Sequence, residues 1–297
     1  MIQNRYVIGV CVVLLGGAFL SLSGIFLRHI EQANGWTILF YRSSAFFITM
    51  STILAFQYRR RTTLAFRAVG KKGVYAAILL SLGNVFYIFA MLNTTVANVV
   101  FIIGSAPLIT ALLCWLFLKE RISVWGMVAM VLAFFGIGLM FADGFNTGSW
   151  FGSLLALAMV VMYAFYLLLL RGNQSVDMVP ATCLSGLITA LIAFPMLSGF
   201  NISQHDLIIC ILLGTVQFGA GFWLLTIGVR YIPAAEVALF SLSESILNPI
   251  WVFLGVGEIP SKLTIYGSAI VLISVVVYST IAIQRERMGL ASNSLET

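Results

Sequence analysis

The chain has 297 residues, of which 61% are hydrophobic and only 9% are charged. A soluble domain is about half apolar and about a quarter charged, so this composition excludes a single water-exposed fold and predicts a polytopic membrane protein. The net charge of +6 comes from basic residues placed between apolar runs, a membrane topology signal that argues against nucleic-acid binding.

The apolar runs are long enough to cross a bilayer, which takes about 20 residues per helix. Only helices and closed barrels satisfy the backbone within lipid, and runs of this length are typical of helices. The sequence therefore predicts an all-α protein with ten membrane spans, numbered in chain order. They cover residues 6–27, 36–58, 73–92, 96–118, 122–142, 150–170, 179–198, 207–229, 234–256 and 263–284.

The Lys and Arg residues are distributed unevenly between the two sets of span ends. With the N-terminus inside, thirteen of the 16 lie at cytoplasmic ends, whereas Arg28 and Lys262 lie at outer ends and Arg42 lies within span 2. Short cytoplasmic loops carry the excess of positive charge in membrane proteins. The pattern therefore predicts a multi-pass protein of the inner (plasma) membrane with both termini in the cytoplasm.

The two halves of the chain repeat each other weakly. A shift of 138 residues places Gly83 on Gly221 and Glu120 on Glu258, and the apolar runs overlay without a gap. Each half has five spans, and because five is odd the second half enters the membrane upside down. This predicts two inverted five-helix repeats, an arrangement common in secondary transporters. The expected organisation is a first repeat at 1–145, a second at 146–284 and a cytoplasmic tail at 285–297.

Two segments, at the ends of spans 4 and 9, are similar to those of a known transporter family. "APLITALLCWLFLKERIS" and "ESILNPIWVFLGVGEIPS" resemble the EamA family of the drug/metabolite transporter superfamily, and the resemblance covers nearly the whole chain. Pro107 matches the usual Pro of span 4, and Glu244 matches the Glu of the usual Glu-Pro pair in span 9, where Ser245 replaces the Pro. The resemblance implies export of small metabolites such as amino acids.

Glu244 is the sharpest candidate site residue. A charged acid at the bilayer centre costs roughly 2.5–3.5 kcal/mol, so it needs a partner, a proton or water. Either it is a cavity acid that binds a substrate amine or carries a proton, or it is a protonated acid that fastens helices; we favour the first. Ser241, Glu244 and Asn248 follow the spacing i, i+3, i+7, which predicts one polar stripe along span 9.

Further polar side chains indicate which helices line a wet cavity, although each alone is also typical of a helix–helix contact. The substrate-binding candidates are Asn84 and Tyr87 in span 3, Tyr163 in span 6, and Gln217 and Trp223 in span 8.

The secondary candidates are Glu236, Arg42 and Asn98. Glu236 is expected to complement the N-terminus of span 9, and Asn98 is its repeat mate. Three roles stay open for Arg42: it snorkels outward, binds a substrate carboxylate or pairs with an acid. A structural role is favoured, since the resemblance implies a basic residue at this point.

The motifs of nucleotide motors, metalloproteases and serine hydrolases are missing, so no enzyme activity, catalytic residue, metal or cofactor is expected. The sequence predicts a secondary transporter that exports a small metabolite by alternating access, with Glu244 as the proton-coupling candidate. The alternatives are an uncoupled facilitator or importer, and a membrane assembly or sensor subunit. The expected partners are a small-molecule substrate, the lipid bilayer and protons, with no nucleic acid, in a monomer or weak homodimer.

Overall fold

The computed structural model describes residues 2–59, 62–119, 124–171, 177–197, 199–228, 231, 240 and 242–293. Three residues singled out from the sequence, Glu120, Glu236 and Ser241, lie outside this set. All the regular elements among the described residues are helical. The helices are α1 (Ile2–Leu20), α2 (Ser23–Arg28), α3 (Gly35–Tyr58), α4 (Thr62–Ala68), α5 (Gly70–Asn93), α6 (Val96–Gly104), α7 (Ala106–Leu118), α8 (Val124–Thr147), α9 (Trp150–Arg171), α10 (Val179–Ala193), α11 (Gln204–Leu212), α12 (Gly221–Gly228), α14 (Ser243–Val256) and α15 (Lys262–Asn293), with a 3-10 turn η2 (Phe194–Met196) and a π-helical segment η3 (Leu213–Ala220).

The described residues contain nine helical stretches that are long and apolar enough to cross a membrane. They correspond to predicted spans 1 to 8 and span 10. For example, Val124–Phe145 corresponds to the prediction at 122–142, and Trp150–Leu170 to the one at 150–170. Span 9, predicted at 234–256, is described only in part, and α14 forms its second half. The all-helical, multi-pass architecture is thus confirmed.

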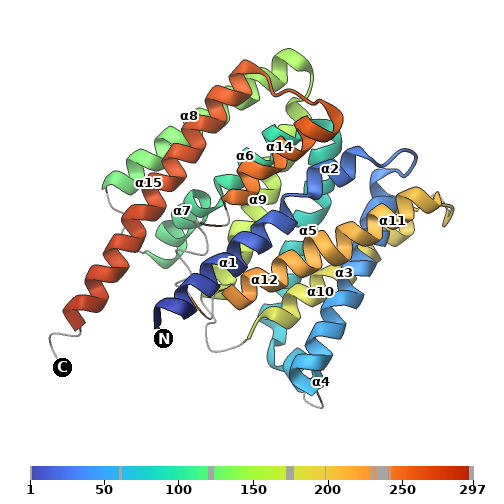
Figure 1. The fold of residues 1–297 in the computed structure, drawn as a ribbon, viewed down its shortest axis with the longest axis horizontal. Coiled ribbons are helices and arrows are strands. Elements are labelled where there is room, and N and C mark those ends of the chain that lie inside the picture. Colours follow the sequence, from blue (N-terminus) through green and yellow to red (C-terminus); the bar gives the residue numbers. More distant parts are fainter. Residues whose placement is uncertain are drawn as a thin grey trace.

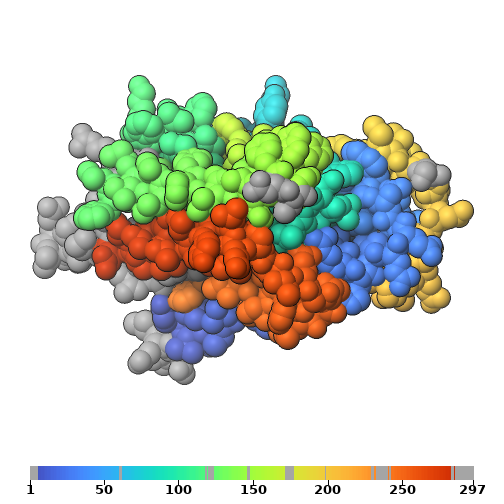
Figure 2. Space-filling model, turned by 90° about the horizontal axis from the view of Figure 1, so that it is seen from above, coloured from blue at the N-terminus to red at the C-terminus, as the bar shows by residue number. Residues whose placement is uncertain are grey.

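The long helices pack in pairs. α5 lies along α9, α8 along α15, α3 along α10, and α1 along α12. The start of α1 and the end of α15 lie at the same end of the bundle (Figure 1). Figure 2 shows α8 and α15 side by side on one face of the molecule. These two helices approach closely, because a Cβ added to Gly267 would lie 2.6 Å from the Gly136 carbonyl oxygen.

The outside of the bundle is apolar. Phe56 is 80% exposed, Val131 69% and Leu254 68%. Soluble monomers rarely expose contiguous apolar surface of this kind, whereas lipid covers it without cost. The helices are therefore apolar on the outer face as well as in the core, as a membrane protein requires.

Three of the nine spans that the structure describes are interrupted within the bundle. Span 1 breaks between α1 and α2 at Ser21, and span 4 breaks between α6 and α7 at Ser105. Span 8 passes through η3. Pro107 lies in the first turn of α7, where its missing N–H is unused. Backbone groups freed by such breaks need partners inside lipid, and Gln217 supplies one, since its Nε2 donates to the Leu20 carbonyl oxygen at 3.0 Å.

Candidate functional site

The break in span 1 is held by the start of α14. The Oδ1 of Asn248 accepts a hydrogen bond from the Gly24 N–H at 3.1 Å, and its Nδ2 donates to the Ser23 Oγ at 2.8 Å. Asn248 is fully buried, and a Cβ on Gly24 would collide with its Oδ1. Both polar atoms of Asn248 are thus occupied by protein groups in this conformation, and they hold α14 against α2.

Ser23 connects this junction to the middle of the bundle. Its side chain also lies close to that of Tyr87 on α5. Tyr87 is 8% exposed, and Asn84 lies one turn before it and is also buried. Asn248, Ser23 and Tyr87 therefore bring spans 9, 1 and 3 together, with a hydrogen bond between the first two.

Glu244 lies in the first described turn of α14, beside this network. Its carboxyl group interacts electrostatically with Tyr87 on α5 and Tyr163 on α9. It is partly exposed, and it forms no hydrogen bond or ion pair with any other described residue. The structure thus brings together one carboxyl group and two tyrosines from three spans, and none of the described residues pairs with that carboxyl group.

The neighbourhood of Glu244 is built for close packing. A Cβ on Gly17 of α1 would lie very close to the Ser243 Oγ, so α1 approaches the start of α14 closely at this glycine. On the other side, the rings of Tyr163 and Tyr166 stack with centroids 5.8 Å apart, and the Tyr166 hydroxyl is hydrogen-bonded to Thr182. The Tyr166 ring thus packs against Tyr163, which interacts electrostatically with Glu244.

Arg42 on α3 is only 2% exposed. Its guanidinium group lies 4.7 Å from the ring centre of Phe218 and 5.6 Å from that of Tyr87. Outward snorkelling, one of the three roles left open by the sequence, is therefore wrong. Among the described residues no carboxylate forms an ion pair with Arg42, so pairing with an acid finds no support either.

The remaining candidates divide into two kinds. Gln217 and Asn98 are buried, and each joins helices: Gln217 bonds to span 1, and the Nδ2 of Asn98 donates to Thr94 and to Ser153 on α9. Trp223 differs, because its side chain is 38% exposed.

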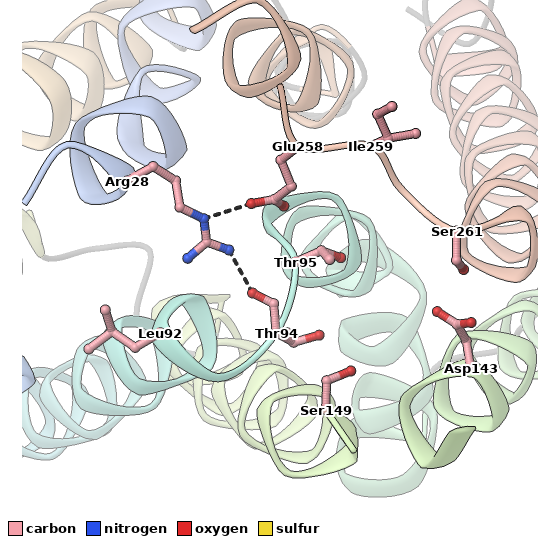
Figure 3. A pocket seen from close by; sticks show the side chains of 9 residues that line it. All are labelled: Arg28, Leu92, Thr94, Thr95, Asp143, Ser149, Glu258, Ile259 and Ser261. Carbon is pink, nitrogen blue, oxygen red and sulfur yellow. Dashed lines mark hydrogen bonds and ion pairs between the residues drawn. The ribbon is translucent and has the colours of Figure 1, made fainter. Parts of the chain in front are cut away.

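A second group of polar residues, at the end of the bundle predicted to face outward, was missed as a site from the sequence. Arg28 at the end of α2 donates through Nε to Glu258 at 2.7 Å, through Nη1 to the Met91 carbonyl oxygen at 2.8 Å, and through Nη2 to that of Thr94 at 2.8 Å. Glu258 in turn accepts a hydrogen bond from the Val96 N–H at 2.7 Å. We call this ion pair with its backbone partners the outer clasp (Figure 3).

The outer clasp borders a pocket of about 430 Å³. Arg28 and Glu258 point toward each other on one side of it, and Asp143 and Ser261 line the other side (Figure 3). The complete lining is Arg28, Leu92, Thr94, Thr95, Asp143, Ser149, Glu258, Ile259 and Ser261. One signal points to the clasp in advance, since Arg28 is one of only two basic residues at outer span ends and Glu258 is an acid at the same level.

A second contact at the same end fixes the loop between α2 and α3. Asp206 at the start of α11 is fully buried. Its carboxylate accepts hydrogen bonds from the backbone N–H groups of Glu31 at 3.0 Å, Gln32 at 3.0 Å and Ala33 at 2.9 Å. Three donors to one carboxylate are charge-assisted and strong. Spans 1 and 2 are thereby tied to span 8.

Comparison with known proteins shows which family this chain belongs to. The model of the EamA-like transporter family matches this chain twice, over residues 7–142 and 150–280. The uncharacterized transporter YwfM of Bacillus subtilis is 28% identical over 211 residues, which cover 69% of this chain and 71% of that protein. A protein of known crystal structure superposes with a TM-score of 0.63 at 19% identity, covering 96% of this chain and 99% of the other, a likeness of fold alone.

Proposed function

Because this chain belongs to the EamA-like transporter family, we propose that it is a ten-span secondary transporter that exports a small metabolite by alternating access. The observation that carries the proposal is the partly exposed carboxyl group of Glu244, which lies near Tyr87 and Tyr163 and pairs with no residue in the described part of the chain. An intramembrane acid without a protein partner is a mark of a substrate or proton pathway.

The ten spans and two inverted repeats are supported by matching helix boundaries 138 residues apart. α7 and α14 both end in a left-handed residue, Lys119 at φ 55° and Gly257 at φ 68°. The next helices start at Val124 and Lys262, again separated by the same shift. The break in span 4 at Ser105 corresponds to Ser243, where α14 begins. We place the repeats at 1–145 and 146–284, followed by the tail at 285–297.

The packing of the helices supports a two-fold relation between the halves. The pairs α3–α10 and α8–α15 each join equivalent spans of the two halves. The pair α5–α9 joins spans 3 and 6, and the pair α1–α12 joins spans 8 and 1. Span 8 is the repeat equivalent of span 3, and span 1 that of span 6, so the two pairs are equivalent. In the same way, α7–α9 has its counterpart in α14–α1. Since each half has five spans, such an axis would lie in the membrane plane.

We propose an inner-membrane location with both termini in the cytoplasm. The charge distribution supports this orientation, because the thirteen basic residues predicted to be cytoplasmic outnumber the two at the other ends. The common position of the start of α1 and the end of α15 agrees with an even number of spans (Figure 1). In this orientation the outer clasp and Asp206 hold the external ends of the helices together. We therefore assign the conformation to the externally closed half of the transport cycle.

Transport is proposed to be coupled to protons through Glu244. Its carboxyl group would release a proton when a cationic group of the substrate arrives and take one up when the substrate leaves. The partners are then a small-molecule substrate, the bilayer and protons, acting on a monomer or weak homodimer. An uncoupled facilitator or importer is the second candidate, since the free carboxyl group is compatible with substrate binding alone.

Metabolite release by whole cells tests the proposal. Cells that express the wild type, Glu244→Gln or no transporter are compared by mass spectrometry of the medium, with equal amounts of protein in the membrane. Export predicts a metabolite that accumulates outside the wild-type cells, and coupling predicts that a protonophore abolishes this accumulation. A facilitator would equilibrate the metabolite regardless of the protonophore. If the three media are identical, the protein is not an exporter, and a sensor or assembly subunit becomes the better account.

A further inference from the structure

Arg42 is a buried cation that lacks a counter-ion among the described residues. It is 2% exposed, its Nε has no hydrogen-bond partner, and no ion pair involves it. An uncompensated charge at membrane depth is costly, and such residues mark ligand pathways when they face the bundle interior. A guanidinium group also presents N–H donors in a fork that matches a carboxylate.

The surroundings of Arg42 hold the guanidinium group without consuming its donors. The rings of Phe218 and Tyr87 attract the charge through their faces, at 4.7 and 5.6 Å, but a ring face accepts no conventional hydrogen bond. The backbone enforces this placement, because a Cβ on Gly214 would collide with the Arg42 carbonyl oxygen. Only a glycine lets η3 approach α3 closely enough to bring Phe218, about one turn further on, against the guanidinium group.

Tyr87 links Arg42 to the proposed transport site. This tyrosine interacts electrostatically with Arg42 and with Glu244, although Arg42 and Glu244 form no ion pair with each other. A cation and an acid from spans 2 and 9 thus lie near the same side chain, each without a charged partner among the described residues. The amide of Gln217, next to Phe218, has a further buried atom without a partner, its Oε1.

We propose that Arg42 is the anion-binding residue of the transport cavity, and that it receives the carboxylate group of a substrate whose cationic group faces Glu244. This rests on the proposed function, which supplies the cavity. The substrate class is then a small zwitterion with its two charges at separate ends. Phe218 and Tyr87 contact the guanidinium group and position it. An inorganic anion such as chloride carries the same charge as a carboxylate, so the experiment distinguishes binding of a substrate carboxylate from binding of an inorganic anion.

A binding assay on the purified, full-length protein tests the inference without requiring transport. The melting temperature is measured with 4-aminobutyrate, butyrate and n-butylamine at equal ionic strength, with sodium chloride and sodium gluconate as reference salts. In the wild type we expect 4-aminobutyrate to raise the melting temperature by about 2–4 °C and butyrate to raise it by less. Arg42→Gln should lose both shifts, and Arg42→Lys should keep part of them.

A matched control comes from an exposed arginine far from the proposed cavity. Arg67→Gln on α4 also removes one arginine and should keep the response to 4-aminobutyrate. Glu244→Gln should reduce the response to 4-aminobutyrate to that of butyrate. Size-exclusion profiles show which variants fold, and Arg42→Lys keeps the test valid if Arg42→Gln does not fold.

Each other result overturns a stated part of the inference. Equal shifts with chloride and butyrate would assign Arg42 to an inorganic anion rather than to a substrate carboxylate. A response to 4-aminobutyrate no larger than that to butyrate would remove the zwitterion. If the wild type shows no shift, or Arg42→Gln shows the wild-type shifts, Arg42 is not an anion-binding residue. A wild-type protein that binds 4-aminobutyrate but releases no metabolite from cells would instead contradict the proposed function.

Discussion

Arg28 and Glu258, 230 positions apart in the sequence, form an ion pair of 2.7 Å at the end of the bundle predicted to be external. The pair also reaches the backbone of the loop between α5 and α6, through the carbonyl oxygens of Met91 and Thr94 and the Val96 N–H. One ion pair thus joins spans 1, 3, 4 and 9. A transporter that opens to the outside must separate these elements, so the clasp is the contact that such a movement has to break.

Removal of the clasp should loosen the external end. Arg28→Gln leaves the Glu258 carboxylate without its cation and two carbonyl oxygens without donors, so we expect the free energy of unfolding to fall by about 1–3 kcal/mol. A cysteine introduced at Thr95, which lines the adjacent pocket, should react faster with an impermeant maleimide when Arg28→Gln is also present. The double variant Arg28→Gln, Glu258→Gln should lose less than the sum of the single variants. Additive losses with unchanged labelling would show that the pair is not a clasp.

Asp206 should be as important for the loop between α2 and α3. Asp206→Asn keeps the shape but removes the charge and one acceptor for the N–H groups of Glu31, Gln32 and Ala33, so a loss of about 1–3 kcal/mol is expected in denaturation. Ser203→Ala is the milder comparison: it removes the helix cap on the Asp206 N–H, which is worth about 1 kcal/mol, and a hydroxyl group beside the Asp206 carboxylate, but keeps the three backbone bonds of that carboxylate. Equal losses in the two variants would mean that the carboxylate does not anchor the loop.

The close approach of α8 and α15 offers a test with a silent control. A Cβ on Gly267 would lie 2.6 Å from the backbone of Gly136, whereas a Cβ on Gly138 meets nothing within 4 Å. Gly267→Ala should therefore lower the melting temperature, at a cost of about 1–3 kcal/mol for overpacking. Gly138→Ala should leave it unchanged or raise it slightly, since alanine is the better helix former. A melting temperature of Gly267→Ala equal to that of Gly138→Ala would contradict the packing.

The helices were predictable because lipid imposes a simple rule. A span needs about 20 apolar residues, and the nine described spans follow the apolar runs closely. Hydropathy carries no information on the breaks within spans 1 and 8. Those depend on partners distant in sequence, such as Gln217 for the Leu20 carbonyl oxygen and Asn248 for the Gly24 N–H. Only the break in span 4 had a local signal, Pro107.

The site was predictable in part for a similar reason. Polar residues in apolar runs are expected to face the interior. The structure places Glu244 near Tyr87 and Tyr163, and their role in binding stays a prediction. Trp223 is 38% exposed; a tryptophan is also stable on the lipid side, so its occurrence in a span does not predict which way it faces. The outer clasp was missed because Arg28 was interpreted as a topology signal and Glu258 as part of a family motif. Neither interpretation predicts an ion pair.

The orientation in the membrane is open to direct labelling. Single cysteines at Asn146 and Lys119, at opposite ends of span 5, are predicted to lie outside and inside, respectively. In a background without the native cysteines, an impermeant maleimide should label Asn146→Cys on intact spheroplasts and Lys119→Cys only after the membrane is opened. Labelling of both positions from the same side would contradict the ten-span topology.

The central claim is that the Glu244 carboxyl group exchanges protons during transport, and a pH profile of export tests it most directly. The metabolite found in the medium of wild-type cells is loaded into vesicles, and its initial rate of transport is measured across neutral pH for the wild type, Glu244→Asp and Glu244→Gln. We predict that Glu244→Asp keeps a pH-dependent rate, and that Glu244→Gln loses the pH dependence and roughly tenfold or more of the rate, equivalent to ~1.4 kcal/mol or more of barrier. A Glu244→Gln protein with the wild-type rate and pH profile would show that Glu244 is a structural acid, and the coupling mechanism would be wrong.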